Sequence, residues 1–308
     1  MTDNYERARR RLESGGVLIL DGGVSTELQR RGVQMANEVW SGRVTLDHWQ
    51  ALVDMHRAYI DSGADIITAN TYASSRLMLE PAGLGGRVEE INRRSVEAAL
   101  VAREQSGASE VIVAGSMSHA IPTQIAGHPL KADDAPGASA LAAAFKEMVS
   151  VFEETDVDLL LLEMMSKPER MLPLFDALSQ NNLPAWCGFS VKRDGVGELR
   201  AIHDESVSFA ANIASAMACT FDVWGVMHTS ADIIGAALSE LKSAAPKPLM
   251  AYPDSGYIEM PNWQFVDVMA PERLADFAAV WISEGAQIVG GCCGLGPEHI
   301  AAIAHLRK

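Results

Sequence analysis

The chain has 308 residues, of which 48% are hydrophobic and 21% are charged, as in ordinary globular domains. Its formal net charge of −15, from 40 acidic and 25 basic residues, argues against nucleic acid or an anionic membrane surface as a partner. The first residues are charged and form no apolar signal segment, and no apolar run approaches the length of about 18 residues that spans a bilayer. Because four cysteines without a spaced framework indicate reduced thiols, we expect a cytoplasmic protein.

Short runs rich in β-branched residues alternate with amphipathic segments along the whole chain. The predicted strands are Val17–Leu20, Ile66–Ala69, Val111–Ala114, Leu159–Leu162, Ala185–Val191, Val223–Val226, Leu249–Tyr252 and Ile288–Val289. The predicted helices are Leu46–Ser62, Arg87–Gln105, Ala138–Glu154, Pro168–Gln180, Glu205–Met217, Ala231–Ser243, Pro271–Glu284 and Pro297–Leu306. Eight strand–helix units predict an α/β fold, a single-domain (β/α)8 TIM barrel over residues 1–308, with an open doubly wound sheet as the alternative.

Polar residues follow most of the predicted strands directly. They are Asp21–Glu27 after the first strand, Asn70–Tyr72 after the second, Glu163 after the fourth, His228–Ser230 after the sixth, Asp254–Gly256 after the seventh and Gly290–Gly294 after the eighth. The two longest loops, Ser118–Gly137 and Pro253–Ala270, also follow strands. In a barrel all these segments lie on the C-terminal face, where this fold carries its active sites, so we expect the active site there.

Cys292 and Cys293 are adjacent at the end of the eighth predicted strand. In a regular strand their side chains would point to opposite faces, but the glycines around them permit a backbone that turns both sulfurs to one side. Two thiolates suit zinc, whereas two small core residues or a strained vicinal disulfide are the alternatives. Catalytic zinc takes three protein ligands, and His228 at the end of the sixth strand is the candidate third ligand. A lone histidine there also fits a hydrogen-bonded cavity residue.

Asp21 and Glu163 are carboxylates at strand ends, where burial requires a cationic or hydrogen-bonding partner. We expect them to bind a substrate ammonium group, and the alternative is a hydrogen-bonded carboxylate at the barrel rim. The turn Gly22-Gly23-Val24 leads from the first strand into a helix. Its backbone N–H groups are therefore candidates for holding a substrate carboxylate.

Seven segments in order along the chain carry a resemblance to a known family. They are DGGVSTELQRRG (Asp21–Gly32), VWSGRV (Val39–Val44), SGADIITANTY (Ser62–Tyr72), VIVAGS (Val111–Ser116), LLLLE (Leu159–Glu163), YPDSG (Tyr252–Gly256) and GGCCG (Gly290–Gly294). On these motifs, of which GGCCG is the most specific, the chain resembles the homocysteine S-methyltransferase family, with its betaine-, S-methylmethionine- and cobalamin-linked members. The resemblance implies a (β/α)8 barrel, zinc ligation by Cys292 and Cys293, and amino-acid binding by Glu163 and Asp21.

The chain departs from the family pattern at two strand ends. The family's third zinc ligand is the cysteine of a Gly-Val/Ile-Asn-Cys pattern after the sixth strand, where this chain has Gly225-Val226-Met227-His228. After the third strand, the usual Gly-Ser-Ile/Leu-Gly-Pro is replaced by Gly115-Ser116-Met117-Ser118-His119. The resemblance thus implies Zn²⁺ as the cofactor, with His228 in the place of the third cysteine.

The resemblance further implies methyl transfer to homocysteine or a similar small thiol. Because the barrel takes up the 308 residues and leaves no cobalamin- or folate-binding module, we expect a free sulfonium or quaternary ammonium donor. Aromatic faces attract such cations, so Tyr72, Trp40 and Trp224 are candidates for the donor side, and Asn70 is a further substrate contact. The alternatives are a same-fold enzyme acting on another methylated osmolyte or thiol, and a non-catalytic metal- or amino-acid-binding relative. The sequence is compatible with a homo-oligomer.

Overall fold

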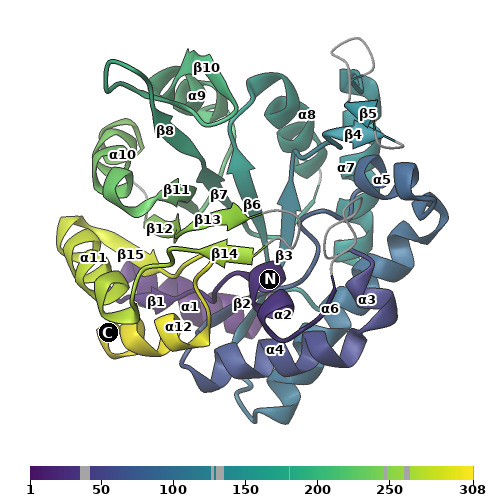
Figure 1. Cartoon of the computed structure of the whole chain (residues 1–308), viewed down its shortest axis with the longest axis horizontal. Coiled ribbons are helices and arrows are strands. Elements are labelled where there is room, and N and C mark those ends of the chain that lie inside the picture. Colours follow the sequence, from purple (N-terminus) through teal and green to yellow (C-terminus); the bar gives the residue numbers. More distant parts are fainter. Residues whose placement is uncertain are drawn as a thin grey trace.

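The computed structural model describes residues 1–34, 42–125, 128–129, 135–179, 181–245, 248–259 and 264–307. Eight parallel strands form its central sheet in the order β1-β15-β12-β11-β7-β6-β3-β2. Their bounds are β1 Leu18–Ile19, β2 Ile66–Thr68, β3 Ile112–Ser118, β6 Leu159–Met165, β7 Ala185–Phe189, β11 Val223–Ser230, β12 Leu249–Asp254 and β15 Ala286–Val289. A parallel bridge between Leu20 and Ile66 joins β1 to β2, so the sheet closes into a barrel (Figure 1). The predicted (β/α)8 fold is confirmed.

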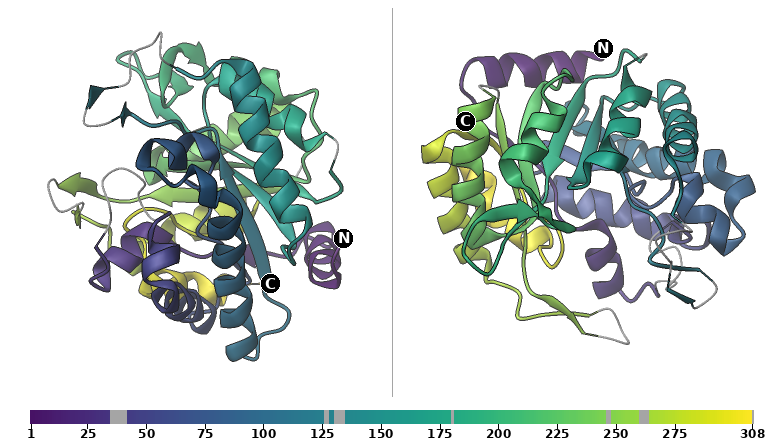
Figure 2. Two further views of the ribbon diagram at one scale, coloured as in Figure 1. Left: turned by 90° about the vertical axis from the view of Figure 1, so that its right-hand side faces the viewer. Right: turned by 90° about the horizontal axis from the view of Figure 1, so that it is seen from above.

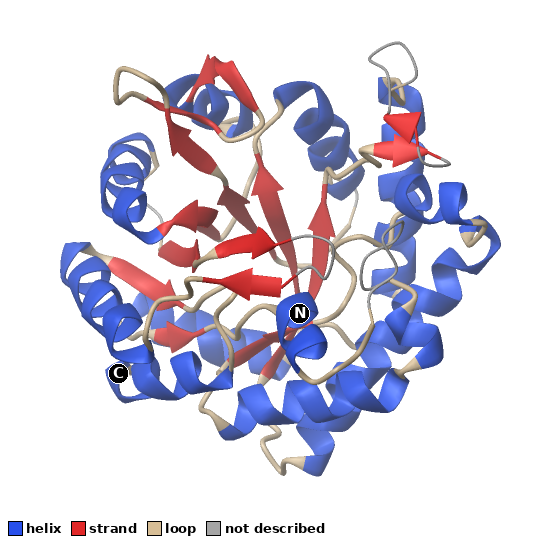
Figure 3. Cartoon of the chain, in the orientation of Figure 1, coloured by secondary structure: helices blue, strands red, loops and turns tan. Residues whose placement is uncertain are grey.

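Helices surround the barrel on its outside (Figure 3). In chain order they are α1 Asp3–Glu13, α2 Val24–Arg30, α3 Val44–Asp47, α4 Trp49–Asp61, α5 Arg76–Leu79, α6 Val88–Gln105, α7 Ala138–Glu153, α8 Pro168–Leu178, α9 Phe209–Ala216, α10 Ala231–Ala244, α11 Pro271–Glu284 and α12 Pro297–Ile303. Short 3-10 helices lie at Glu80–Ala82, Gly85–Arg87 and Ala304–Leu306. Among the described helices, none has the length and apolar composition that a membrane crossing requires.

Alternate residues of each barrel strand divide the core into two layers. In β6, Leu159 and Leu161 are buried inside the barrel, whereas Leu160 and Leu162 are buried against the surrounding helices. Successive side chains of a strand point to opposite faces, and both faces of a barrel strand are covered. This explains why an uninterrupted run of four leucines forms a strand here.

The structure differs from the predicted elements after the fifth barrel strand. The predicted strand Ala185–Val191 ends at Phe189 as a barrel strand, and β8 (Val191–Arg193) joins a small antiparallel sheet with β9 (Leu199–Ala201) and β10 (Asp204–Ser208). The predicted helix Glu205–Met217 was therefore wrong at its start, because α9 begins only at Phe209. The pairing of β10 with β9 decides this boundary, and the local sequence pattern does not reveal that partner.

Two further hairpins leave the C-terminal face of the barrel. The hairpin of β13 (Tyr257–Glu259) and β14 (Gln264–Val266) follows β12, and the pair β4 (Gln124–Ile125) and β5 (His128–Pro129) follows β3. Both lie in the two loops that the sequence identified as longest. They extend the rim of the barrel mouth on the side where the strands end (Figure 2).

Helix α1 was not predicted, and it covers the opposite end of the barrel from the β13–β14 hairpin (Figure 2). Tyr5 is 1% exposed, and its hydroxyl donates to Asp222 Oδ2 at 2.5 Å and accepts from Trp186 Nε1 at 3.1 Å. Gln287 Nε2 donates to the Leu12 carbonyl at 2.6 Å. These contacts hold the helix against the N-terminal ends of the strands.

We expect Tyr5→Phe to destabilise the fold, because it leaves the Trp186 indole N–H and a carboxylate oxygen of Asp222 without their partner. An unsatisfied buried polar group costs about 1–3 kcal/mol, so the free energy of unfolding measured by urea denaturation should fall by about that amount. Tyr257→Phe is the matched control, since that side chain is 56% exposed. Equal unfolding free energies for the two variants would contradict this role of Tyr5.

Candidate active site

A cavity of about 340 Å³ opens at the C-terminal ends of the barrel strands. Nine of the predicted site residues line it: Gly22, Gly23, Val24, Asn70, Tyr72, Glu163, His228, Cys292 and Cys293. The ends of the barrel strands thus bring together residues that lie up to 271 positions apart (from 22 to 293). Asp21, the tenth, does not line the cavity.

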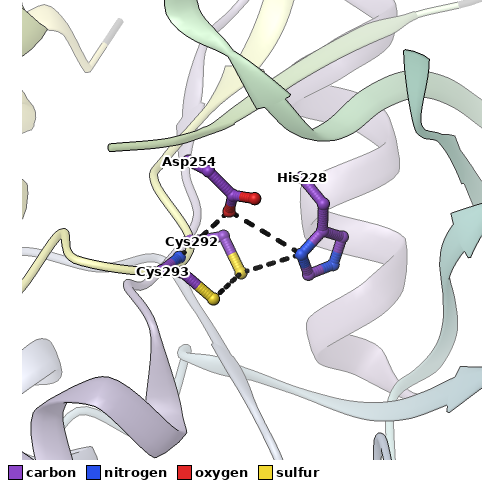
Figure 4. A group of neighbouring side chains, drawn as sticks. All are labelled: His228, Asp254, Cys292 and Cys293. Carbon is purple, nitrogen blue, oxygen red and sulfur yellow. Dashed lines mark hydrogen bonds and ion pairs between the residues drawn. The ribbon is translucent and has the colours of Figure 1, made fainter. Parts of the chain in front are cut away.

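The side chains of Cys292, Cys293, His228 and Asp254 converge at one side of this cavity (Figure 4). Cys292 Sγ lies 3.9 Å from Cys293 Sγ and 3.2 Å from His228 Nδ1, and Asp254 Oδ1 lies 3.8 Å from the same nitrogen. All four candidate ligand atoms lie within 4.8 Å of one another. Ligand atoms around a tetrahedral zinc ion are about 3.3–3.8 Å apart, so the cluster has the size of a metal coordination sphere.

The backbone around the cysteine pair explains how both sulfurs reach the same side. The Cys292 N–H donates to the Pro253 carbonyl at 2.7 Å, and the Ser255 N–H donates to the Cys293 carbonyl at 3.0 Å, so the end of β12 holds this loop. Gly294 has φ +82°, and a Cβ atom on it would lie 2.3 Å from the Ser255 carbonyl oxygen. A glycine is therefore required directly after the pair.

His228 is oriented by a carboxylate on its far side. Its Nε2 lies 2.9 Å from Glu163 Oε2, which leaves Nδ1 facing the sulfur of Cys292. The Ser116 hydroxyl hydrogen-bonds the other oxygen of Glu163. A metal-binding histidine commonly donates its second ring N–H to a carboxylate, and this fixes the tautomer and the ring orientation. His228 also has φ +45°, an unusual conformation for a residue with a side chain, of the kind found at functional sites.

The cavity wall is anionic. It carries the carboxylates of Glu163 and Asp254 and the two thiols, but neither lysine nor arginine among the described residues that line it. Burial raises the pKa of the Cys292 thiol, while the hydrogen bond from Cys292 lowers the pKa of Cys293. A bound cation would stabilise both thiolates, and two sulfurs, an imidazole and a carboxylate are donors that zinc accepts. The residues present therefore fit a metal.

Asp21 lies beneath the cavity wall and ties two strands together. Its side chain is 0% exposed and accepts from the Thr68 N–H at 2.7 Å and from the Thr68 hydroxyl at 2.9 Å. Burial raises the pKa of this carboxyl to about 8. An ammonium group brought next to it would favour the ionised form.

The three aromatic residues predicted for the donor side differ in where they lie. Tyr72 lines the cavity, with its ring centroid 5.8 Å from that of His228. Trp224 does not: it is 3% exposed and packs against Phe189 in the outer core, so its prediction was wrong. Periodicity showed that residue 224 is on a strand but not which face it occupies. Trp40 lies outside the described residues.

Sequence reasoning missed two residues of this wall. Asp254 was noted at a strand end but not as a candidate metal ligand, although its strand β12 neighbours β15, which carries the cysteines. Tyr252 also lines the cavity and donates from its hydroxyl to the Gly22 carbonyl at 3.1 Å. The predicted barrel could have indicated both residues, because it pairs the seventh strand with the eighth and so brings their ends together.

The glycine turn after β1 packs directly on the cysteine loop. A Cβ atom on Gly23 would lie 2.6 Å from the Cys292 carbonyl oxygen, and the Gly23 N–H donates to the Leu295 carbonyl at 3.1 Å. This close approach, more than an anion site, explains the second glycine of the Asp-Gly-Gly motif. The N–H of Gly23 is already used and is not available to a substrate carboxylate.

We expect Gly23→Ala to displace the Cys292 backbone and to weaken metal binding. Misplacement of supporting groups costs about 10–100-fold in metal affinity, and a decrease of this size is expected here. Gly32→Ala is a control for an added methyl group, because no atom lies within 4 Å of the position that its Cβ would take. Since Gly32 has φ +88°, this control also includes the backbone strain of a substituted glycine. Zinc affinity measured by chelator competition checks this, and an unchanged affinity in Gly23→Ala would contradict it.

Comparisons with known proteins agree with this geometry. The family model described as homocysteine S-methyltransferase matches residues 18–306. The chain is 28% identical to homocysteine S-methyltransferase 3 of Arabidopsis thaliana, over 99% of this chain and 92% of the relative. It is 26% identical to the homocysteine S-methyltransferase of Escherichia coli, over 95% and 96%.

The comparison with solved structures shows the same fold. The metallated form of the homocysteine methyltransferase MmuM from Escherichia coli superposes with a TM-score of 0.78 at 24% identity, covering 96% of this chain and 98% of that one. The chain belongs to the homocysteine S-methyltransferase family and is, as its sequence predicted, a methyltransferase.

Proposed function

We propose that the protein is a zinc-dependent S-methyltransferase that moves a methyl group from a small sulfonium or quaternary ammonium donor to homocysteine or a similar thiol. His228, Cys292 and Cys293 would hold the zinc. The observation that carries the proposal is the convergence of their ligand atoms within 4.8 Å, with the Glu163 carboxylate behind the imidazole. The lack of lysine and arginine among the described residues of the cavity wall supports a site for cations.

Methyl transfer needs a thiolate acceptor, because a free thiol near pKa 8.5 is mostly protonated at neutral pH. When bound, zinc would deprotonate a coordinating thiol while leaving a sulfur lone pair for attack. A lone pair of the acceptor sulfur forms the new S–C bond, and the methyl–onium bond breaks with its electron pair staying on the leaving atom. The thiol proton passes to solvent when the acceptor binds.

The chain's own residues position the two substrates. Glu163 orients His228 and, with Asp254, places negative charge where a cationic donor gains stabilisation. We assign Glu163 also to the ammonium group of the amino acid, and Gly22, Val24 and Asn70 to its remaining polar groups. Asp21, which was predicted for the same ammonium group, lies behind the cavity wall and holds Thr68 in that wall instead. Tyr72 offers an aromatic face to the onium group. Correct placement of donor and acceptor can lower the activation free energy of methyl transfer by up to about 7–11 kcal/mol.

A donor panel with homocysteine tests this function. Zinc-loaded protein is incubated with S-methylmethionine, S-adenosylmethionine or betaine, and methylated thiols are detected by mass spectrometry. We expect methionine from at least one donor and none from the Cys292→Ser/Cys293→Ser variant. Thiol methylation that persists in this double variant, or no methylation of homocysteine by any donor, would overturn the proposal.

We expect Glu163→Gln to weaken zinc binding as well as thiol binding, since Glu163 Oε2 lies 2.9 Å from Nε2 of His228, the proposed ligand. Removal of such an outer partner costs about 10–100-fold in metal affinity. Glu153→Gln, on the outer surface of α7, is the control for loss of one negative charge. Unchanged zinc and homocysteine dissociation constants in Glu163→Gln would show that the carboxylate has neither role.

A further inference from the structure

Strand β6 contains one extra residue where it reaches the cavity. Between Leu162 and Met165 it has two residues, Glu163 and Met164, whereas β7 has only Gly188 between their register partners. This is a β-bulge, a feature that redirects side chains and is frequent beside active sites. Glu163 already has a role in the proposed function, but Met164 has none.

The bulge turns the side chains of two successive residues toward the cavity. In a regular strand successive side chains point to opposite faces, as those of Leu161 and Leu162 do. Glu163 and Met164 instead both line the cavity, and Met164 has φ +62°. This conformation is costly for a residue with a side chain and is held in place by the surrounding structure, typically at functional sites. His228, on the same cavity wall, shares it.

Met164 holds the phenol of Tyr72 in the cavity wall. The Tyr72 hydroxyl donates to Met164 Sδ at 2.9 Å. Ser118 on β3 fixes the backbone of Tyr72, since its hydroxyl donates to the Tyr72 carbonyl at 2.8 Å, and its side chain also interacts with the phenol. The Tyr72 ring lies next to the His228 imidazole, with centroids 5.8 Å apart. Thioether, phenol and imidazole therefore follow one another along the wall, from β6 to the proposed metal site.

A stronger acceptor, the Glu163 carboxylate, is adjacent to Met164 in the chain but is already in use. Its two oxygens interact with the Ser116 hydroxyl and with His228 Nε2. A thioether sulfur is a weak and uncharged acceptor. Met164 therefore holds the phenol of Tyr72 without drawing the carboxylate away from the imidazole.

We infer that Met164 is a positioning residue for the methyl donor: its thioether fixes the Tyr72 ring against which the onium group packs. This rests on the proposed function, in which Tyr72 offers its aromatic face to that group. A cation is attracted over the face of a ring, within about 6 Å of the centroid, so the attraction depends on where the ring is held.

The expected effect is on donor binding more than on the chemical step. The onium group carries its full positive charge in the bound donor and becomes neutral as the methyl group leaves. A contact that favours the cation is therefore strongest before transfer, and its loss raises KM for the donor without lowering kcat. Binding of the acceptor thiol at the metal should not change.

Two substitutions of Met164 separate its role as an acceptor from its volume. With zinc-loaded protein, homocysteine and S-methylmethionine, we expect Met164→Leu to raise KM for S-methylmethionine about three- to tenfold. Its kcat and its KM for homocysteine should change by less than about twofold. Met164→Gln restores an acceptor at a similar reach, so KM for S-methylmethionine should return to within about twofold of wild type. Met217→Leu is the matched control, because that side chain is 50% exposed and does not line the cavity.

A double-mutant cycle shows whether Met164 acts through Tyr72. Tyr72→Phe removes the hydroxyl and keeps the ring, so Met164→Leu in that background should raise KM for S-methylmethionine by less than about twofold further. Additive effects would overturn the inference, as would equal losses in Met164→Leu and Met164→Gln, which would indicate a role in packing alone. A rise in KM for homocysteine alone would place Met164 on the acceptor side and overturn it too.

Nuclear magnetic resonance keeps this inference separate from the proposed function. The chain has 14 methionines, and after labelling of their methyl groups with 13C the signal that disappears in Met164→Leu belongs to Met164. We expect this signal to shift in Tyr72→Phe and, in zinc-loaded wild type, on addition of S-methylmethionine. Both shifts in a protein that methylates no thiol would support the placement of Met164 while the transferase proposal fails. Absence of either shift would overturn the inference even in an active enzyme.

Discussion

Replacing Cys292 and Cys293 with serine is expected to abolish stoichiometric zinc binding and methyl transfer together. The two sulfurs lie 3.9 Å apart and are the donors that distinguish this cluster from an ordinary polar cavity. A hydroxyl is a far weaker ligand than a thiolate, and loss of even an outer-sphere partner costs about 10–100-fold in affinity. We therefore expect each single variant to lose at least about 100-fold in zinc affinity.

Metal content after dialysis and chelator competition measure this effect. Wild-type protein should retain one zinc per chain, and the double variant should retain almost none. Cys219→Ser is the matched control, because that thiol is partly exposed and lies on the outer core, away from the cavity. Full zinc occupancy in the double variant would show that the cysteine pair is not the metal centre.

The barrel could be predicted because each strand carries its own signal. A strand such as β6 is buried on both faces, so its apolar run stands out, and the polar residue that follows it marks the C-terminal face. The same order of elements placed Glu163, His228 and Cys292 at one mouth before any distance was known. Strand order in a barrel follows chain order, so this part of the site needed no three-dimensional information.

The features that the sequence did not predict depend on contacts between segments that lie far apart along the chain. The pairing of Glu163 with His228 joins residues 65 positions apart, and no periodicity indicates that the carboxylate faces an imidazole as well as a substrate. Helix α1 is held by Tyr5, whose partners Trp186 and Asp222 are far along the chain. His203 contacts the hydroxyl of Ser166, at 2.8 Å, only because the β8–β10 sheet leaves the barrel after β7.

Replacing His228, the proposed third zinc ligand, is also expected to have a large effect. In His228→Ala we expect zinc affinity to fall at least about 100-fold, as for the cysteines. In His228→Cys the metal should be retained, but the three ligands then carry three negative charges instead of two. A more anionic ligand set makes zinc a weaker Lewis acid, so a coordinating thiol keeps its proton to higher pH. The midpoint of homocysteine binding against pH should therefore move upward from its wild-type position.

The contact between Glu163 and His228 provides an independent test of the His228→Cys substitution. In wild type it accepts from His228 Nε2 at 2.9 Å, but in His228→Cys it would face a third thiolate and lose that donor. Glu163→Gln should then cost less zinc affinity in the His228→Cys background than in wild type. Groups in direct contact typically couple by about 0.5–3 kcal/mol, and a double-mutant cycle on zinc dissociation constants measures this. Additive effects would mean that the carboxylate does not act through the imidazole, and wild-type zinc affinity in His228→Ala would remove the histidine from the ligand set.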